Sequence, residues 1–209
     1  MTDGRLARGE RTRGAVLDAA VSMASVDGLE AMSLARLAHA TEVSKSGLFA
    51  HWPDKEALQL AVIARAVHIW TAHVVTPAFA EPRGVRRLWA LHERRIEFYA
   101  SGVLPGGCFF VATQAEFDDR PGPVRDALAA AINDWLFLIK AVAAQAVELG
   151  ELRPDADVEQ VAFEIEAHGH AVVTFSRLLH AEGAAAYGRT AVLERLRSLS
   201  PVPDLLPAS

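Results

Sequence analysis

The sequence has few of the features that mark secreted, disulfide-bonded or membrane-spanning proteins. Its 209 residues include a single cysteine, Cys108, which excludes an internal disulfide and suits a reducing cytoplasm. The first ten residues carry arginines but no apolar run, so they do not read as a signal peptide. The most apolar stretch, residues 135–147, is interrupted by Lys140 and is too short to span a bilayer. We therefore expect a soluble, cytoplasmic protein with no membrane partner.

An excess of basic residues is also absent. The net charge is -5 at pH 7, which argues against a protein that coats nucleic acid through overall charge. Residues 1–58 hold seven Lys and Arg against eight Asp and Glu, so DNA binding would have to depend on where those charges lie. Segment 43–52 contains Lys45 and no acid, and segment 5–13, which we expect to be an arm, has four arginines against Glu10.

Alternation of β-branched and polar residues is rare, whereas alanine and leucine recur at helical spacing. The pattern predicts an all-α protein with a three-helix N-terminal helix-turn-helix domain and a larger C-terminal helical domain. We expect about nine helices, over residues 12–24, 34–40, 44–52, 55–74, 85–100, 108–117, 124–149, 158–180 and 185–199. The predicted domains are residues 1–54 and 55–200, followed by a loose, proline-rich tail at 201–209.

The segment that carries function consists of two short helices, 34–40 and 44–52, joined by a tight turn, which fits a DNA-binding helix-turn-helix. Val43, Leu48 and Trp52 are expected to pack inward. The other face begins with residues 44–47, which offer short hydrogen-bonding groups and one cation at the positive end of the helix dipole. The same spacing occurs in many all-helical proteins, so spacing alone leaves ordinary helix packing open.

The amino acids in this segment favour a DNA-binding helix-turn-helix over ordinary helix packing. Residues 33–38 read SLARLA and residues 41–58 read TEVSKSGLFAHWPDKEAL. In order and spacing they resemble the TetR family of transcriptional regulators, whose common pattern is Thr, three residues, Ile-Ala, then Ala-Gly-Val-Ser, then Leu-Tyr-x-His-Phe and Lys-Glu-x-Leu. The chain length and the expected helix count also suit that family. Residues 106–110 and 116–126 resemble one branch of it.

The resemblance implies a homodimer that binds operator DNA. The implied DNA-binding residues are Ser33, Ser44, Lys45, Ser46, Gly47, Phe49, His51 and Lys55. Phe49 stands at a tyrosine position and lacks the hydroxyl that would bind phosphate. Glu42 replaces the turn glycine, and Gly47 replaces a serine or threonine. Lys45 is the candidate for a base contact, because lysine reaches guanine acceptors, although a phosphate contact fits it equally.

The resemblance further implies that the remaining helices bind a small-molecule inducer and dimerise. Aromatic and polar positions on the long helices are candidates for the pocket, with ordinary core packing as the alternative for each: Trp70, Trp89, His92, Phe110, Gln114, Trp135 and His168. Helices 158–180 and 185–199 are the expected dimer contacts. Ala167, Gly169 and Ala171 form a small-residue patch that would permit close approach.

Two other classes of protein are alternatives to a DNA-binding regulator. An enzyme or metalloprotein is disfavoured: no histidine has a glutamate three residues before it, as a di-iron bundle needs, and the phosphate-loop and nucleophile-elbow motifs are missing. We expect no metal and no cofactor. A ligand-binding or interaction module that has lost DNA binding stays open because of Glu42, Gly47 and Phe49. The favoured prediction is a repressor that an inducer releases from its operator.

Overall fold

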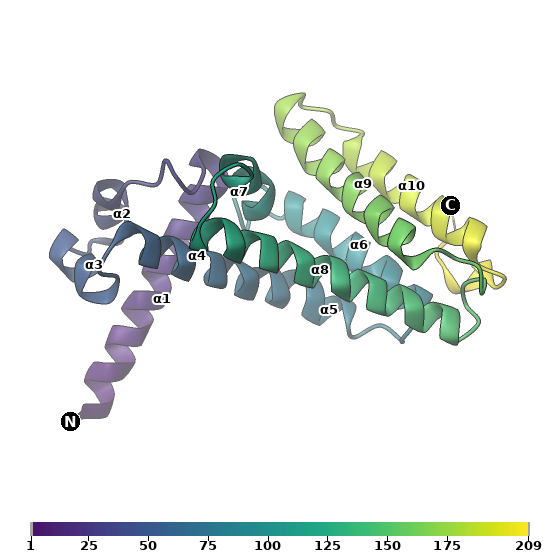
Figure 1. The fold of residues 1–209 in the computed structure, drawn as a ribbon, viewed down its shortest axis with the longest axis horizontal. Helices are drawn as coiled ribbons and strands as arrows, with labels where there is room; N and C mark the ends of the chain where they lie inside the picture. Colours follow the sequence, from purple (N-terminus) through teal and green to yellow (C-terminus); the bar gives the residue numbers. More distant parts are fainter. Residues whose placement is uncertain (1, 209) are drawn as a thin grey trace. The chain divides into compact units, whose positions relative to one another are not determined.

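The computed structural model describes the backbone of residues 2–208 and the side chains of residues 9–208. Over that range the chain is helical without strands (Figure 1), and it has nine helices if the continuous run α4–η1–α5 is counted once. This confirms the predicted fold class. The helices are α1 (Thr2–Asp27), α2 (Leu34–Thr41), α3 (Lys45–His51), α4 (Lys55–Trp70) with the π-helical η1 (Thr71–Val75) and α5 (Thr76–Ala78), α6 (Val85–Ala100), α7 (Phe109–Phe117), α8 (Pro123–Glu148), α9 (Val158–Leu178) and α10 (Ala184–Leu199), followed by a short 3-10 turn η2 (Pro203–Leu205).

The chain divides into two compact units. Unit 1 comprises the residues up to 69 together with 103–130, and unit 2 comprises 70–102 together with the residues from 131 onward. The boundary predicted after residue 54 does not coincide with this division. The reason is that α4 and α7 pack with the N-terminal helices: Arg65 of α4 pairs with Asp18 of α1 at 2.7 Å, and α7 lies against α1.

The helices of unit 1 begin and end at capping residues that can be identified in the local sequence. Ser44 caps α3 by accepting a hydrogen bond from the Gly47 amide at 3.1 Å, and Asp54 caps α4 by accepting from the Ala57 amide at 2.7 Å. Gly28 ends α1 in the left-handed region at φ 84°. The apolar face of each helix is buried in one core with members from α1 to α4, including Val16, Ala20, Leu37, Leu48 and Leu58.

Unit 2 is centred on α6, α9 and α10, with the later part of α8. The helices α9 and α10 run side by side in opposite directions (Figure 1), and α6 packs against both. Asp157 caps α9 by accepting hydrogen bonds from the Glu159 and Gln160 amides at 3.0 and 3.1 Å. The core of unit 2 is mainly aliphatic. Its fully buried side chains include Leu88, Ile139, Val161 and Leu196.

The core of unit 2 also contains a buried cation. Arg95 is 1% exposed and donates hydrogen bonds to the Ile165 carbonyl oxygen and, at 2.8 Å, to the Glu166 carboxylate. Gly169 makes room for it, since a Cβ there would lie 1.6 Å from the guanidinium. The sequence-based placement of Gly169 in a dimer patch is therefore wrong: it faces Arg95, while Ala167 is exposed.

Two terminal segments differ from expectation. The predicted arm at residues 5–13 belongs to α1, which begins at Thr2; the side chains of Arg5 and Arg8 lie outside the described residues. The predicted loose tail instead folds back onto unit 2. Leu206 is buried in the core, and Arg197 donates a hydrogen bond to the Pro207 carbonyl oxygen.

Two helical runs, Lys55–Ala78 and Pro123–Glu148, are long and apolar enough to cross a membrane by length and composition alone. Helices in the core of soluble proteins meet the same test, and both runs supply core residues here, such as Leu58 and Ile139.

Candidate nucleic-acid interface

The turn between α2 and α3 has the geometry of a helix-turn-helix. The helix α2 ends at Glu42, whose φ of 55° and ψ of 21° are left-handed. The chain then re-enters a helix at Lys45, with Ser44 extended as its N-cap. Leu48 and Trp52 are 1% and 4% exposed, which confirms that they pack inward; Val43 is half-buried. One face of α3 is therefore fixed against unit 1.

The opposite face of α3 is free of carboxylates and open to solvent. Ser44, Lys45 and Ser46 are exposed at its N-terminus, and the hydroxyl oxygens of the two serines lie 3.0 Å apart. Phe49 and His51 are exposed further along. An ammonium group, two hydroxyls and the first amides of a helix form a surface suited to the acceptors of the DNA major groove and its phosphates.

Gly47 and Ser33 flank this surface differently. Gly47 is half-buried, and an added Cβ would lie 3.0 Å from Val43 Cγ1, so the glycine lets the start of α3 lie close to the turn. Ser33 is the extended N-cap residue of α2, but its hydroxyl makes no capping hydrogen bond. That hydroxyl is positioned before α2 and is not used to cap it.

Lys55 is not a free cation in this structure. Its Nζ donates to the Glu30 carbonyl oxygen at 2.8 Å and lies 2.9 Å from Glu30 Oε1. Gln59 also donates to Glu30 Oε2 at 3.3 Å. The hydrogen bond from Lys55 lowers the pKa of the Glu30 carboxyl, with smaller contributions from Gln59 and the charge of Arg120. Sequence reasoning missed Glu30, because nothing in the motif points to a partner 25 residues before Lys55.

Arg13, which the sequence predicts to lie in an arm, is exposed on α1 and contacts Trp52 at the end of α3. Its guanidinium carbon lies 5.9 Å from the centroid of the Trp52 ring, within reach of a cation–π contact. The ring of His51 lies 5.5 Å from that of Trp52. Trp52 thus joins α1 to the end of α3.

The structure brings some of the predicted pocket residues together. The rings of Trp70 and Trp135 meet edge to face at 5.1 Å, and Trp135 Nε1 donates to Glu166 Oε2 at 2.9 Å. The rings of Trp89 and His92 lie 5.9 Å apart. All of these lie in unit 2. Phe110 and Gln114 lie on α7 in unit 1.

His92 has no exposed surface and uses Nε2 to donate to the Gly188 carbonyl oxygen at 3.0 Å. It therefore joins α6 to α10 in this structure. Its pKa is well below the usual value, first because of burial and then because of the positive charge of Arg95.

Trp89 also lines a surface cavity of about 370 Å³, together with Arg86, Glu93, Arg94 and Leu206 among others.

A capped helix with one buried and one exposed, acid-free face, held behind a tight turn, is the arrangement that helix-turn-helix DNA-binding proteins use. The family model for bacterial regulatory proteins of the tetR family matches residues 16–62. The model for the tetracycline repressor-like C-terminal domain matches residues 84–192, more than half of the chain. The chain therefore belongs to the TetR family and is a DNA-binding transcriptional regulator.

Relatives agree with this assignment. The chain is 28% identical over 151 residues to the HTH-type transcriptional repressor ComR of Escherichia coli K12, covering 72% of each protein. A TetR transcriptional regulator from Chloroflexus aurantiacus has the same fold, with a TM-score of 0.85 at 23% identity over 92% of this chain and 98% of that one. AibR, solved in complex with isovaleryl coenzyme A and operator DNA, matches with a TM-score of 0.66 at 21% identity over 91% of this chain and 98% of that one.

Proposed function

We propose that this regulator is a cytoplasmic homodimeric repressor that binds operator DNA through α3 and is released by a small-molecule inducer. The observation that carries the proposal is the exposed start of α3, where Ser44, Lys45 and Ser46 project from a helix whose other face is buried. In a dimer, two such helices would reach successive major grooves at a separation of about 34–36 Å. Lys45 is the residue proposed to read a base, and Lys55 the residue proposed to hold phosphate.

Exposed apolar side chains on the last two long helices support dimerisation. Phe163 and Leu178 of α9 are 67% and 75% exposed, and Tyr187 of α10 is 76% exposed. Phe175 of α9 and Leu179, which directly follows α9, are also exposed. Large apolar side chains exposed together are typical of surfaces that a partner covers, and a second copy of this chain would bury them.

Unit 2 offers aromatic surface for an inducer. Trp70 and Trp135 form an edge-to-face pair, and Phe98 lies 5.6 Å from Trp70. Apolar and aromatic walls with a few polar groups are typical of small-molecule sites. AibR, of the same fold, was solved with both an acyl coenzyme A and operator DNA, which is consistent with one chain carrying both sites. The inducer can shift the dimer only by its difference in affinity for the two states.

The test is binding of the purified full-length chain to the DNA upstream of its own gene, compared with a scrambled duplex of equal composition, at two salt concentrations. We expect saturable binding to a near-palindromic site with a steep salt dependence. Lys45→Ala should lose preference for that site, whereas Lys55→Ala should weaken binding to both duplexes equally. Lys140→Ala is the matched control, because it removes a lysine of unit 2 that pairs with Glu159.

Equal binding to both duplexes at both salt concentrations would contradict the proposal. The chain would then be better described as a ligand-binding module of the same fold. If sequence-specific binding is found but no compound that binds the protein weakens it, only the part of the proposal that concerns induction fails.

A further inference from the structure

The main-chain amides of the loop between α1 and α2 donate hydrogen bonds to a side chain of α7. The Glu116 carboxylate accepts hydrogen bonds from the amides of Leu29, at 2.7 Å, and Glu30, at 3.2 Å. On the other side, Gln59 of α4 donates to the Leu29 carbonyl oxygen at 3.3 Å. The main chain at residues 29–30 is therefore fixed from two helices, which leaves the Glu30 side chain in a defined place between them.

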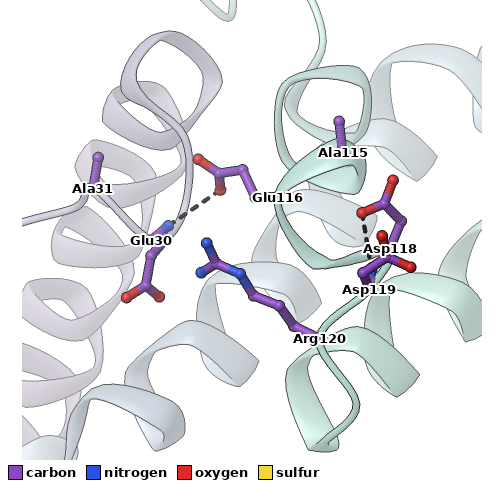
Figure 2. A pocket seen from close by; sticks show the side chains of 7 residues that line it. All are labelled: Glu30, Ala31, Ala115, Glu116, Asp118, Asp119 and Arg120. Atoms are coloured by element: carbon purple, nitrogen blue, oxygen red, sulfur yellow. Dashed lines mark hydrogen bonds between the residues drawn. The ribbon is translucent and has the colours of Figure 1, made fainter.

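The Glu30 side chain lies between two cations. On one side is Lys55. Two of the three N–H donors of its Nζ contact Glu30, one at the carbonyl oxygen at 2.8 Å and one at Oε1 at 2.9 Å. On the other side is Arg120, in the segment between α7 and α8. Figure 2 shows the Arg120 guanidinium directed between Glu30 and Glu116 in a cavity of about 410 Å³.

Arg120 is close to Glu30 without being paired to it. In the part of the chain whose side chains are described, no salt bridge within 4.0 Å involves Arg120. Its charge nevertheless acts on Glu30, since it helps to lower the pKa of that carboxyl. Glu30 thus has one bound cation, Lys55, and a second cation within the same cavity, Arg120, whose guanidinium carbon lies 5.9 Å from the centroid of the Phe117 ring.

We propose that Glu30 is a positioning residue that withholds Lys55 from DNA, and that Arg120 is the alternative partner of Glu30 whose approach releases Lys55. The inference rests on the proposed phosphate contact of Lys55. The Glu30 carboxylate and a DNA phosphate oxygen are both anionic acceptors, so they compete for the same ammonium. When Arg120 neutralises Glu30, Lys55 turns to phosphate without leaving an unpaired carboxylate behind.

This exchange has a signature in the salt dependence of binding. A lysine that moves from solvent to a phosphate releases about 0.9 of a counterion from the DNA. While Glu30 holds Lys55 through its carbonyl and carboxylate oxygens, that release does not take place. Removing the Glu30 charge should therefore both strengthen binding and steepen its dependence on salt.

The experiment measures binding of the full-length chain to the duplex that the wild type prefers, over a series of salt concentrations. Glu30→Gln is expected to tighten binding roughly two- to fivefold, the size of one exposed ion pair, with a steeper salt slope. Asp119→Asn is the matched control, because it removes a carboxylate from the same cavity that does not touch Lys55. In the Lys55→Gln background, Glu30→Gln should match Asp119→Asn.

The role of Arg120 is tested in both backgrounds. Arg120→Gln should weaken binding about two- to threefold in the wild type and no more than the control in Glu30→Gln. The control is Arg125→Gln, which removes an exposed arginine paired with Asp126. Thermal unfolding of each variant verifies that the fold is intact.

Three results would overturn the inference: Glu30→Gln that binds no tighter than Asp119→Asn, tightening that persists without Lys55, or an Arg120→Gln effect of the same size in both backgrounds. Failure of the proposed function is distinguishable, because the wild type would then prefer no duplex at all.

Discussion

The buried histidine of α6 makes the stability of this protein depend on pH. His92 is fully buried and donates through Nε2 to the Gly188 carbonyl oxygen, and Nδ1 has no hydrogen-bond partner among the side chains and main chain that the structure describes. The cations Arg95, on its own helix, and Arg189, on α10, act on it, and His168 of α9 is a further titratable neighbour. Burial, and after it these charges, place the pKa of His92 well below the usual value of 6.5. The folded chain therefore excludes a proton that the unfolded chain accepts.

The direction and the magnitude of this pH dependence follow from the linkage between proton binding at His92 and folding. Because the pKa is lower in the folded state, the stability from neutral His92 is present above pH 6.5 and is lost as the pH falls below it. If neutral His92 takes up no proton in the folded state over this range, the free energy of unfolding falls by about 2 kcal/mol between pH 7.5 and pH 5.0, the cost of protonating the unfolded histidine alone. The contributions of all other titrating groups cancel when the variant and the wild type are compared over the same pH range.

The variant is His92→Gln, which keeps an amide donor for Gly188 and cannot titrate. Urea unfolding at pH 7.5 and pH 5.0, at one fixed chain concentration, should show that the variant loses about 2 kcal/mol less than the wild type over this interval. His39→Gln is the matched control, because it removes a histidine that is exposed on α2. A His92→Gln variant with the same loss as the wild type would refute the reasoning.

Three further substitutions test the backbone and packing arguments by urea unfolding. Glu42→Gly should stabilise the protein by about 0.5–1 kcal/mol, since it removes a left-handed non-glycine residue at φ 55°; no gain would contradict the strain. Gly28→Ala should cost about 2 kcal/mol or more, because the residue has φ 84° and its Cβ would lie 1.7 Å from Glu116 Oε1. Gly169→Ala should also cost about 2 kcal/mol or more despite the better helix propensity of alanine, since its Cβ would displace the paired guanidinium of Arg95; a neutral result would mean that Arg95 moves without loss.

The identity of the helices and of the DNA-binding motif could be predicted from the sequence because both depend on local information. The spacing of Leu48 and Trp52, the capping hydroxyl of Ser44 and the carboxylate of Asp54 act within one or two turns of chain. Segments without a core pattern were predicted less well. The stretch before Thr12 continues α1, and the proline-rich tail docks because Leu206 finds a place in the core of unit 2.

The partners of charged residues were decided only by the tertiary structure. The motif marks Lys55 as a cation, but it does not show that Glu30, 25 residues earlier, accepts its hydrogen bonds. Glu116 lies 87 residues from the amide of Leu29, from which it accepts a hydrogen bond. The sequence predicts that Gly169 belongs to a small-residue patch for dimer contact, whereas in the structure it makes room for Arg95. Helical periodicity and capping are properties of neighbouring residues, so the sequence alone determined them; which side chains meet across helices depends on how the helices pack, and no local pattern encodes that.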